Sequence, residues 1–257
     1  MKQRLLSRAE ARDPTRTLRI EKVYERRLVG LFTDYKGWLK KTIENMRALE
    51  TPAKAPIFDP KLILSSLDDA AKWIIYQRAT EIAQEAVYKS YWQGKLYSDE
   101  QAKRMNLVNP EMNIQVAFNL PLHRKTLDIL YDRNTHAIKG VAEDVNKQIG
   151  RELTEGILQG EDVRRLSKRI AGIVDDVGII RARTIARTET MYATNKGIKT
   201  NWESMGITKF VWVTTKDEKT CPQCGPLDGQ IVPDEWPTEP PLHPNCRCTI
   251  KPYIGGV

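Results

Sequence analysis

Five soft metal ligands near one end restrict the folding of this 257-residue chain more than any other part of its sequence. All four cysteines lie in the last 37 residues, with Cys221 and Cys224 in one cluster and Cys246 and Cys248 in a second, which also contains His243. Two turns that each carry closely spaced ligands can close around one tetrahedral ion, and zinc suits a mixed set of thiolates and imidazole. The sequence therefore predicts a structural zinc site.

Five side chains compete for four positions around such an ion. Cys221, Cys224 and His243 are the first three candidates, and Cys246 and Cys248 compete for the fourth. In an extended segment these last two side chains point to the same face, so their direction does not choose between them. A set of all four cysteines without His243 also stays open.

Two other states are open to the same cysteines. They can form two disulfides, although disulfides are rare in a reducing cytosol, and a stapled secreted domain would spread its cysteines along the chain. They can also be free thiols in a packed core, which the small number of large apolar residues in the tail disfavours. A tail this small has too little apolar core to supply its own folding free energy. A metal can supply it, because zinc contributes roughly 10 kcal/mol or more to the folding of small modules.

Most of the chain before this tail has the three- and four-residue apolar spacing of amphipathic helices. Asp13 and Pro14 can start a helix that runs to about Leu49, and Thr51–Pro56 is predicted to be a linker. Later helices are expected from Asp59 to Gly94, from Pro121 with breaks at Gly156 and Gly160, over Glu161–Ile173, and from Ile179 to Ser204 with a stop at Gly206. Between them, Ser98 can start a short helix and residues 113–119 are predicted to be extended.

The pattern changes after Gly206. Residues 207–215 are rich in β-branched and aromatic types, which predicts a strand, and eight of the 14 prolines follow Gly206. The predicted fold class is therefore mainly α, with an extended helical body and a small C-terminal β-rich, zinc-stabilised module, α+β overall. We divide the chain into a basic amphipathic helix (1–50), a helical lead-in (51–120), a helical body (121–206) and the Cys/His module (207–257).

The positive charge is concentrated in the first segment. The chain has a formal net charge of +8, and residues 1–50 hold 13 Lys or Arg against 7 Asp or Glu. A basic arm of this kind suits a polyanion such as DNA, although it is also compatible with a solvated helix face. No run of 18 apolar residues predicts a membrane span, and the first residues lack the apolar stretch of a secretory signal.

The motifs of common enzymes are absent from the sequence. It contains neither the H-x-E string of zinc deaminases nor H-E-x-x-H, G-x-S-x-G or a P-loop. His123 and His136 are predicted to be ordinary helix-surface residues. Four acids of the tail can bind a metal but are expected to cap turns, and Asp228 with Gly229 is expected to form a hairpin turn. These acids are Asp217, Asp228, Asp234 and Glu235.

The string IARTET at residues 185–190 needs its own interpretation. Arg187 and Glu189 are two residues apart, so they cannot face each other on a helix. We therefore predict that the polar residues of this helix fasten it to the tail, rather than that they form a catalytic pair.

A series of short strings runs in order from about Val141 to Lys251. They are a helix with Leu153 and Gly156, then Leu166–Ile170, Arg181–Ala182, IARTET, Asn195, Gly197, Gly206, Trp212, Asp217, TCPQC at 220–224, LDG at 227–229 and PLHPNCRC at 241–248. Each string is weak alone, but as a set they resemble the phage head morphogenesis family, the Mu protein F-like minor head proteins. The first 120 residues carry no such signature.

This resemblance implies a minor component of tailed-phage heads, present in few copies, that associates with the portal vertex and acts in head assembly or on packaged DNA. It implies a structural protein rather than an enzyme. The expected partners are portal protein and major capsid or scaffolding protein, with DNA contacted by the basic first helix and no membrane. The expected location is the phage head, and the host cytoplasm during assembly.

Two other functions remain open from the sequence. One is a nucleic-acid-binding zinc knuckle without sequence preference, which the slightly acidic tail disfavours. The other is a metal-dependent hydrolase or nuclease, which would need an open coordination position that five soft ligands make hard to keep.

Overall fold

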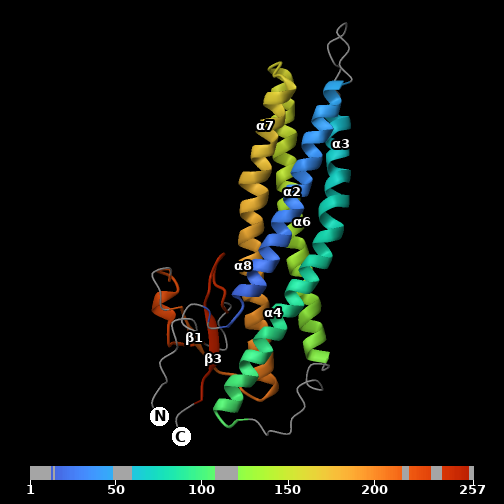
Figure 1. The fold of residues 1–257 in the computed structure, drawn as a ribbon. Coiled ribbons are helices and arrows are strands. Elements are labelled where there is room, and N and C mark those ends of the chain that lie inside the picture. Colours follow the sequence, from blue (N-terminus) through green and yellow to red (C-terminus); the bar gives the residue numbers. More distant parts are fainter. Residues whose placement is uncertain are drawn as a thin grey trace. The chain divides into compact units, whose positions relative to one another are not determined.

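The computed structural model describes Asp13 and residues 15–48, 60–107, 121–215, 220–232 and 239–254. Its helices are α2 (Leu18–Ala48), α3 (Pro60–Ala71), α4 (Gln77–Arg104), α6 (Pro121–Leu158), α7 (Val163–Ile173) and α8 (Ile180–Ser204), with π-helical segments η1 (Lys72–Tyr76) and η2 (Val174–Ile179) (Figure 1). The strands are β1 (Phe210–Val213), β2 (Ile231–Val232) and β3 (Thr249–Pro252), and a short 3-10 helix covers Gly225–Leu227.

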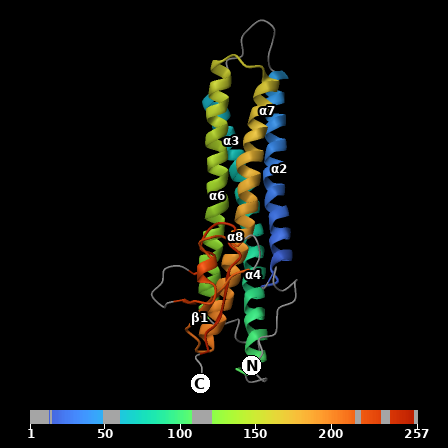
Figure 2. The same cartoon turned by 90° about the vertical axis from the view of Figure 1, so that its left-hand side faces the viewer.

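The chain forms two compact units. The first consists of the described parts of residues 1–23, 84–132 and 186–257, and the second of those of residues 24–83 and 133–185. The second unit is a four-helix bundle in which α2, α6, the segment from α3 into α4 and the segment from α7 into α8 lie side by side (Figures 1 and 2). The division of the sequence at residues 50, 120 and 206 stays a prediction.

Two buried tyrosine–asparagine hydrogen bonds fix the alignment of α2 and α6 in this bundle. The hydroxyl of Tyr24 donates to Asn134 Oδ1 at 2.6 Å, and that of Tyr35 donates to Asn146 Oδ1 at 2.5 Å. Since the partner numbers rise together, α2 and α6 run parallel. Burial, followed by the nearby charge of Asp68, raises the pKa of Tyr35, so its hydroxyl stays protonated and acts as a donor.

The segment from α7 into α8 runs antiparallel to α2. Lys36 pairs with Asp175 at 2.6 Å, and Arg183 pairs with Glu25 at 3.3 Å. We expected separate helices over Glu161–Ile173 and Ile179–Ser204, but η2 joins them without a break. At Gly178 a Cβ would lie 2.7 Å from the ring of Phe32, so this glycine allows close packing of the two helices and does not end a helix.

Glycines also place α4 against α8 in the first unit. A Cβ on Gly94 would overlap the backbone carbonyl of Thr194, and one on Gly197 would overlap that of Tyr91. The expected helix end at Gly94 and the expected helix start at Ser98 are therefore wrong, because α4 continues through both positions. The hydroxyl of Ser98 instead donates to the carbonyls of the preceding turn.

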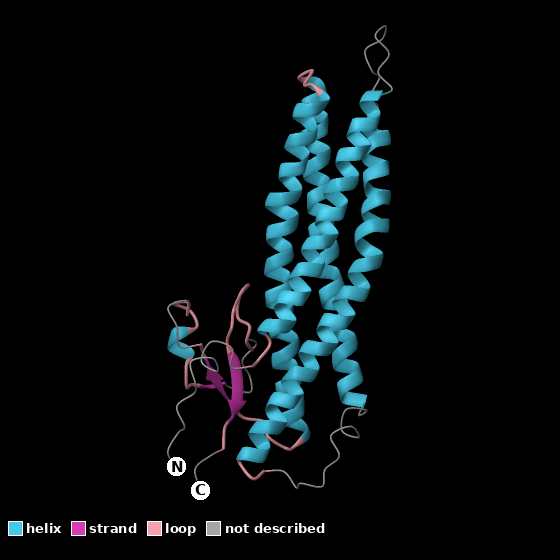
Figure 3. Cartoon of the chain, in the orientation of Figure 1, coloured by secondary structure: helices cyan, strands magenta, loops and turns pink. Residues whose placement is uncertain are grey.

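The three strands form an antiparallel sheet in the order β2-β1-β3 (Figure 3). The chain reaches it through Gly206, whose φ of +80° ends α8 as predicted. Phe210 and Trp212 of β1 are buried in a cluster with Trp202 of α8 and the cysteines Cys224, Cys246 and Cys248. The prediction of a helical body followed by a small β-rich module is thus confirmed.

Some predictions fall outside the described residues. These are the role of Pro14, the linker at 51–56 and the extended segment at 113–119. No described helix combines the length and the apolar character that crossing a membrane requires.

The close approach of α4 and α8 predicts opposite effects of the same substitution at two helical glycines. Gly197→Ala places a methyl group into the backbone of α4 and should lower the free energy of unfolding by about 1–3 kcal/mol. Gly140→Ala, at a position with nothing within 4 Å of the new Cβ, should raise it by about 0.5–1 kcal/mol through helix propensity. Urea unfolding measures both, and equal effects would contradict the packing.

Candidate metal centre

The structure brings the five predicted ligands together at one place in the first unit. They form two overlapping groups, Cys221 with Cys224 and His243, and Cys224 with Cys246 and Cys248. Within each group the ligand atoms lie within 4.8 Å of one another, and Cys224 belongs to both. These groups could hold a metal ion.

The spacing of the ligand atoms fits a small tetrahedral ion. Bonds of about 2.3 Å to such an ion separate two thiolates by about 3.8 Å. The sulfurs of Cys224 and Cys246 are 3.8 Å apart. The Nε2 atom of His243 lies 3.0 Å from the sulfur of Cys221 and 3.3 Å from that of Cys224, slightly closer than this spacing. The donor chemistry, soft sulfur with one imidazole, suits zinc.

The first ligand pair lies on a tight turn. The N–H groups of Cys224 and Gly225 donate to the carbonyl of Cys221 at 3.1 and 3.0 Å, and the 3-10 helix follows. The same N–H of Cys224 lies 3.3 Å from the sulfur of Cys221. Burial opposes ionisation of Cys221, but hydrogen bonds from Cys224 and Gln223 outweigh it and lower its pKa. The turn therefore favours a thiolate at Cys221.

The second cluster has a comparable turn. The N–H of Cys246 donates to the carbonyl of His243 at 3.1 Å, and Asn245 between them has a φ of +62°. A hydrogen bond from the thiol of Cys248 lowers the pKa of Cys246 to about 5 against the effect of burial, and it raises that of Cys248. Both cysteines lie close to Cys224, so both stay candidates for the fourth position.

The histidine is oriented by its own backbone neighbour. His243 Nδ1 lies 2.8 Å from the carbonyl oxygen of Pro244, which can only accept a hydrogen bond. Nδ1 therefore carries a proton, and Nε2 is the ring atom that faces the sulfurs of Cys221 and Cys224 and would coordinate an ion. Metal-binding histidines commonly have this arrangement.

All four cysteines are free of disulfides. Cys224, Cys246 and Cys248 are buried, whereas Cys221 and His243 are partly exposed. The two-disulfide state is therefore not the one that the structure shows. The structure instead holds a compact group of free thiols beside one imidazole.

The IARTET helix contacts this module directly, as we predicted. The N–H of Asn245 donates to Thr188 Oγ1 at 3.1 Å. Further along α8, the amide of Asn195 donates to the carbonyl of Cys248 at 3.0 Å. We did not single out Asn195 as a site residue from the sequence. Its spacing of seven from Thr188, two helical turns on one face, was the available signal.

The other candidate residues take structural roles where they are described. Asp228 and Gly229 lie in a turn that the N–H of Gln230 closes onto the carbonyl of Leu227 at 3.0 Å, with a φ of +80° at Gly229. The expected hairpin turn is wrong, because residues 214–230 separate β1 from β2. Asp228 also accepts a hydrogen bond from the N–H of Thr214 at 2.9 Å. His136 is exposed, but the prediction for His123 is wrong, since it is fully buried with Nδ1 2.6 Å from the hydroxyl of Tyr91. Asp217, Asp234 and Glu235 lie outside the described residues.

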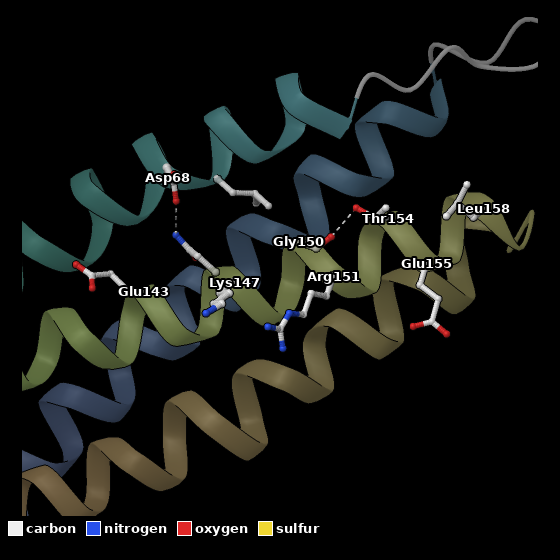
Figure 4. A pocket seen from close by; sticks show the side chains of 10 residues that line it. Asp68, Glu143, Lys147, Gly150, Arg151, Thr154, Glu155 and Leu158 are labelled. Atoms are coloured by element: carbon white, nitrogen blue, oxygen red, sulfur yellow. Dashed lines mark hydrogen bonds between the residues drawn. The ribbon is translucent and has the colours of Figure 1, made fainter.

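A groove of about 710 Å³ between α3 and α6 in the second unit has a different character (Figure 4). Its polar lining is a solvated helix surface, with Asp68 accepting from Asn146 at 3.2 Å and Thr154 donating to the carbonyl of Gly150 at 2.9 Å. None of its lining residues is a cysteine, serine or histidine. Its one hydroxyl, that of Thr154, is bonded within its own helix and so is not paired with a base.

The described residues thus define a helical protein with a small β module that is closed by a cysteine–histidine cluster. Residues 147–251 match the sequence model of the phage Mu protein F-like family. The match contains α7, α8, the sheet and every candidate ligand. The resemblance to the phage head morphogenesis family is therefore confirmed over this region, and it supports a phage head-related protein.

Two curated relatives are similar to this chain. An uncharacterized protein of Methanocaldococcus jannaschii is 32% identical over 150 residues, which are 58% of this chain and 24% of the relative. An uncharacterized protein of Haemophilus influenzae is 25% identical over 143 residues, 53% of this chain and 31% of the relative. The chain therefore spans about a quarter to a third of the length of these relatives. No solved structure matches it.

The shared position of Cys224 predicts that one substitution removes metal binding whichever ligand set is used. Cys224→Ser should reduce bound zinc from one ion per chain to none, as measured by elemental analysis. It should also make the tail sensitive to protease while far-UV circular dichroism keeps most of its helical signal. Gln223→Ser, an exposed change in the same turn, is the matched control and should behave as wild type.

Serine variants of Cys246 and Cys248 then identify the remaining ligands. One of them should release the ion if His243 is a ligand, and both should release it if the set is all four cysteines. A tail that keeps its protease resistance in Cys224→Ser would contradict the structural role of the site.

Proposed function

We propose that this chain is a structural minor head protein of a tailed phage, which acts in head assembly at or near the portal. The observation that carries the proposal is the family match over residues 147–251, which covers α8 and all five candidate ligands of the cysteine–histidine module. The phage head, with the host cytoplasm during assembly, is the proposed location.

The proposed metal is a structural zinc ion. Four protein ligands leave no coordination position for a substrate, and structural zinc sites are closed in this way. The sheet supports this role because its strands contain only four, two and four residues, too few to be stable without further restraint. The ion would contribute folding energy to the module, and the residues of the module would provide all of its ligands.

The proposed protein partners are portal protein and major capsid or scaffolding protein, with DNA as a further partner of the basic first helix. Several cations of α2 are exposed, among them Arg19, Lys22 and Arg26. Their positive charge suits phosphate groups or an acidic protein surface.

The structure gives less support to the two alternative functions. A strand-gripping knuckle stacks successive bases on exposed aromatic side chains, but in the described part of the tail Phe210 and Trp212 are buried and Tyr253 is the one exposed aromatic residue. A hydrolase needs an open metal position or a nucleophile beside a base. Here five candidate ligands lie close enough together to fill the four positions of a tetrahedral ion, which would leave none open.

Crosslinking within purified phage heads tests the main proposal. We expect this chain to be present in few copies and to crosslink with portal protein, identified by mass spectrometry of the linked peptides. Crosslinks that reach only the major capsid protein would move its site away from the portal. Absence from heads and from assembly intermediates would contradict the structural role.

DNA contact predicts a salt-dependent affinity that falls when charges on α2 are reversed. Because α2 is a core helix of the bundle, substitutions are a cleaner test than removal of residues 1–50. The triple variant Arg19→Glu, Lys22→Glu and Arg26→Glu should weaken binding and reduce the slope against log salt by up to about 3. Reversing three exposed cations of α7 is the matched control and should change the slope less. These are Arg164, Arg165 and Lys168.

A further inference from the structure

The loop that carries the second ligand cluster is bound along one helix, α8. At its start, the carboxylate of Glu239 pairs with Lys196 at 2.6 Å and also contacts Lys199. In its middle, the N–H of Asn245 donates to the hydroxyl of Thr188 at 3.1 Å. Residues 239–245 are thus fastened to α8 at two points before the chain reaches the last two cysteines.

Asn195 fastens the end of the same loop with both halves of its amide. Its Nδ2 donates to the carbonyl of Cys248 at 3.0 Å, and its Oδ1 accepts from the hydroxyl of Thr249 at 2.8 Å. Asn195 is 4% exposed and Thr249 is fully buried. Hydrogen bonds of this kind, shielded from water, fix the geometry of the groups they join.

The loop that carries Cys221 and Cys224 is held differently. Its hydrogen bonds run to β1 and to the residues that follow β1. The N–H of Gly229 donates to the carbonyl of Trp212 at 2.9 Å, and Asp228 accepts from the N–H of Thr214. The loop of the first two cysteines is therefore attached to the sheet, whereas the loop of the second cluster is attached to α8 along its length and enters the sheet only at Thr249, directly after Cys248.

We infer that Asn195 is a positioning residue of the metal centre, which sets the cysteines of the second cluster against α8 so that their sulfurs meet those of the loop that carries Cys221 and Cys224. The inference rests on the proposed metal site. Partners that orient ligands from outside a metal site typically change metal affinity by 10- to 100-fold when they are replaced.

The variant Asn195→Asp tests this role with almost no change in size. It keeps the acceptor for Thr249 but loses the donor to the carbonyl of Cys248, and it places a negative charge beside that carbonyl and the thiolates. We expect Co²⁺ affinity, measured by competition with a chelator, to fall by about 10- to 100-fold. The visible absorption bands of the Co²⁺-loaded protein should also shift, because the ligand geometry changes.

The matched control is Asn201→Asp on the same helix. Asn201 is also buried, but its amide donates to Ser98 and Asp99 of α4, at 2.8 and 2.7 Å. This variant should lower the midpoint of thermal unfolding while the Co²⁺ affinity and spectrum of the folded protein stay as in wild type. A merely structural role of Asn195 would give the same result at position 195.

Three outcomes are distinguished. Wild type that binds neither Co²⁺ nor Zn²⁺ overturns the metal site and this inference together. Wild type that binds, with Asn195→Asp unchanged in affinity and spectrum, overturns the inference alone. If Asn195→Asp does not fold, the test is Thr249→Val, which removes only the hydrogen bond from the Thr249 hydroxyl to Asn195 Oδ1. A several-fold loss of Co²⁺ affinity in this variant supports the inference, and an unchanged affinity overturns it.

Discussion

The convergence of two loops on the sulfur of Cys224 is the contact on which the C-terminal module depends. This sulfur belongs to both ligand groups, with His243 on one side and Cys246 at 3.8 Å on the other. A three-stranded sheet of this size has too little apolar surface to stay folded by itself. Its stability therefore has to come from the ligand cluster, from the core around Trp202 and Trp212, and from the hydrogen bonds to α8.

The helical part is specified by a different kind of contact, namely buried polar pairs at fixed spacing. The bonds Tyr24–Asn134 and Tyr35–Asn146 recur after eleven residues on α2 and twelve on α6, about three turns in each case. A shift by one helical turn would break both bonds and leave buried polar groups without partners, which costs more than the bonds themselves contribute. Apolar stripes alone would allow such a shift, so these pairs select one alignment.

Sequence periodicity and ligand spacing were enough to predict the helices, the strand β1 and the five candidate ligands, because these features depend on neighbours close in the chain. The errors arose where a distant contact decides. Gly94 looks like a helix end, but the backbone of α8 occupies the space that a side chain would need. His123 has the sequence pattern of a surface residue, but it is buried and hydrogen-bonded to Tyr91, which is 32 residues away in the chain. The partners of Asn195 lie more than fifty residues away, so its spacing from Thr188 indicates a shared helix face but not the groups that it binds.

The strings that carry the family resemblance are parts of one contact surface in space. Thr188 of IARTET binds Asn245 of PLHPNCRC, Asn195 binds the residues at the end of that string, and the LDG turn caps the segment after β1. Through these hydrogen bonds the residues hold the two ligand-bearing loops in place. Within the region that matches the phage Mu protein F-like family, the resembling strings therefore hold the two ligand loops against α8 and the sheet.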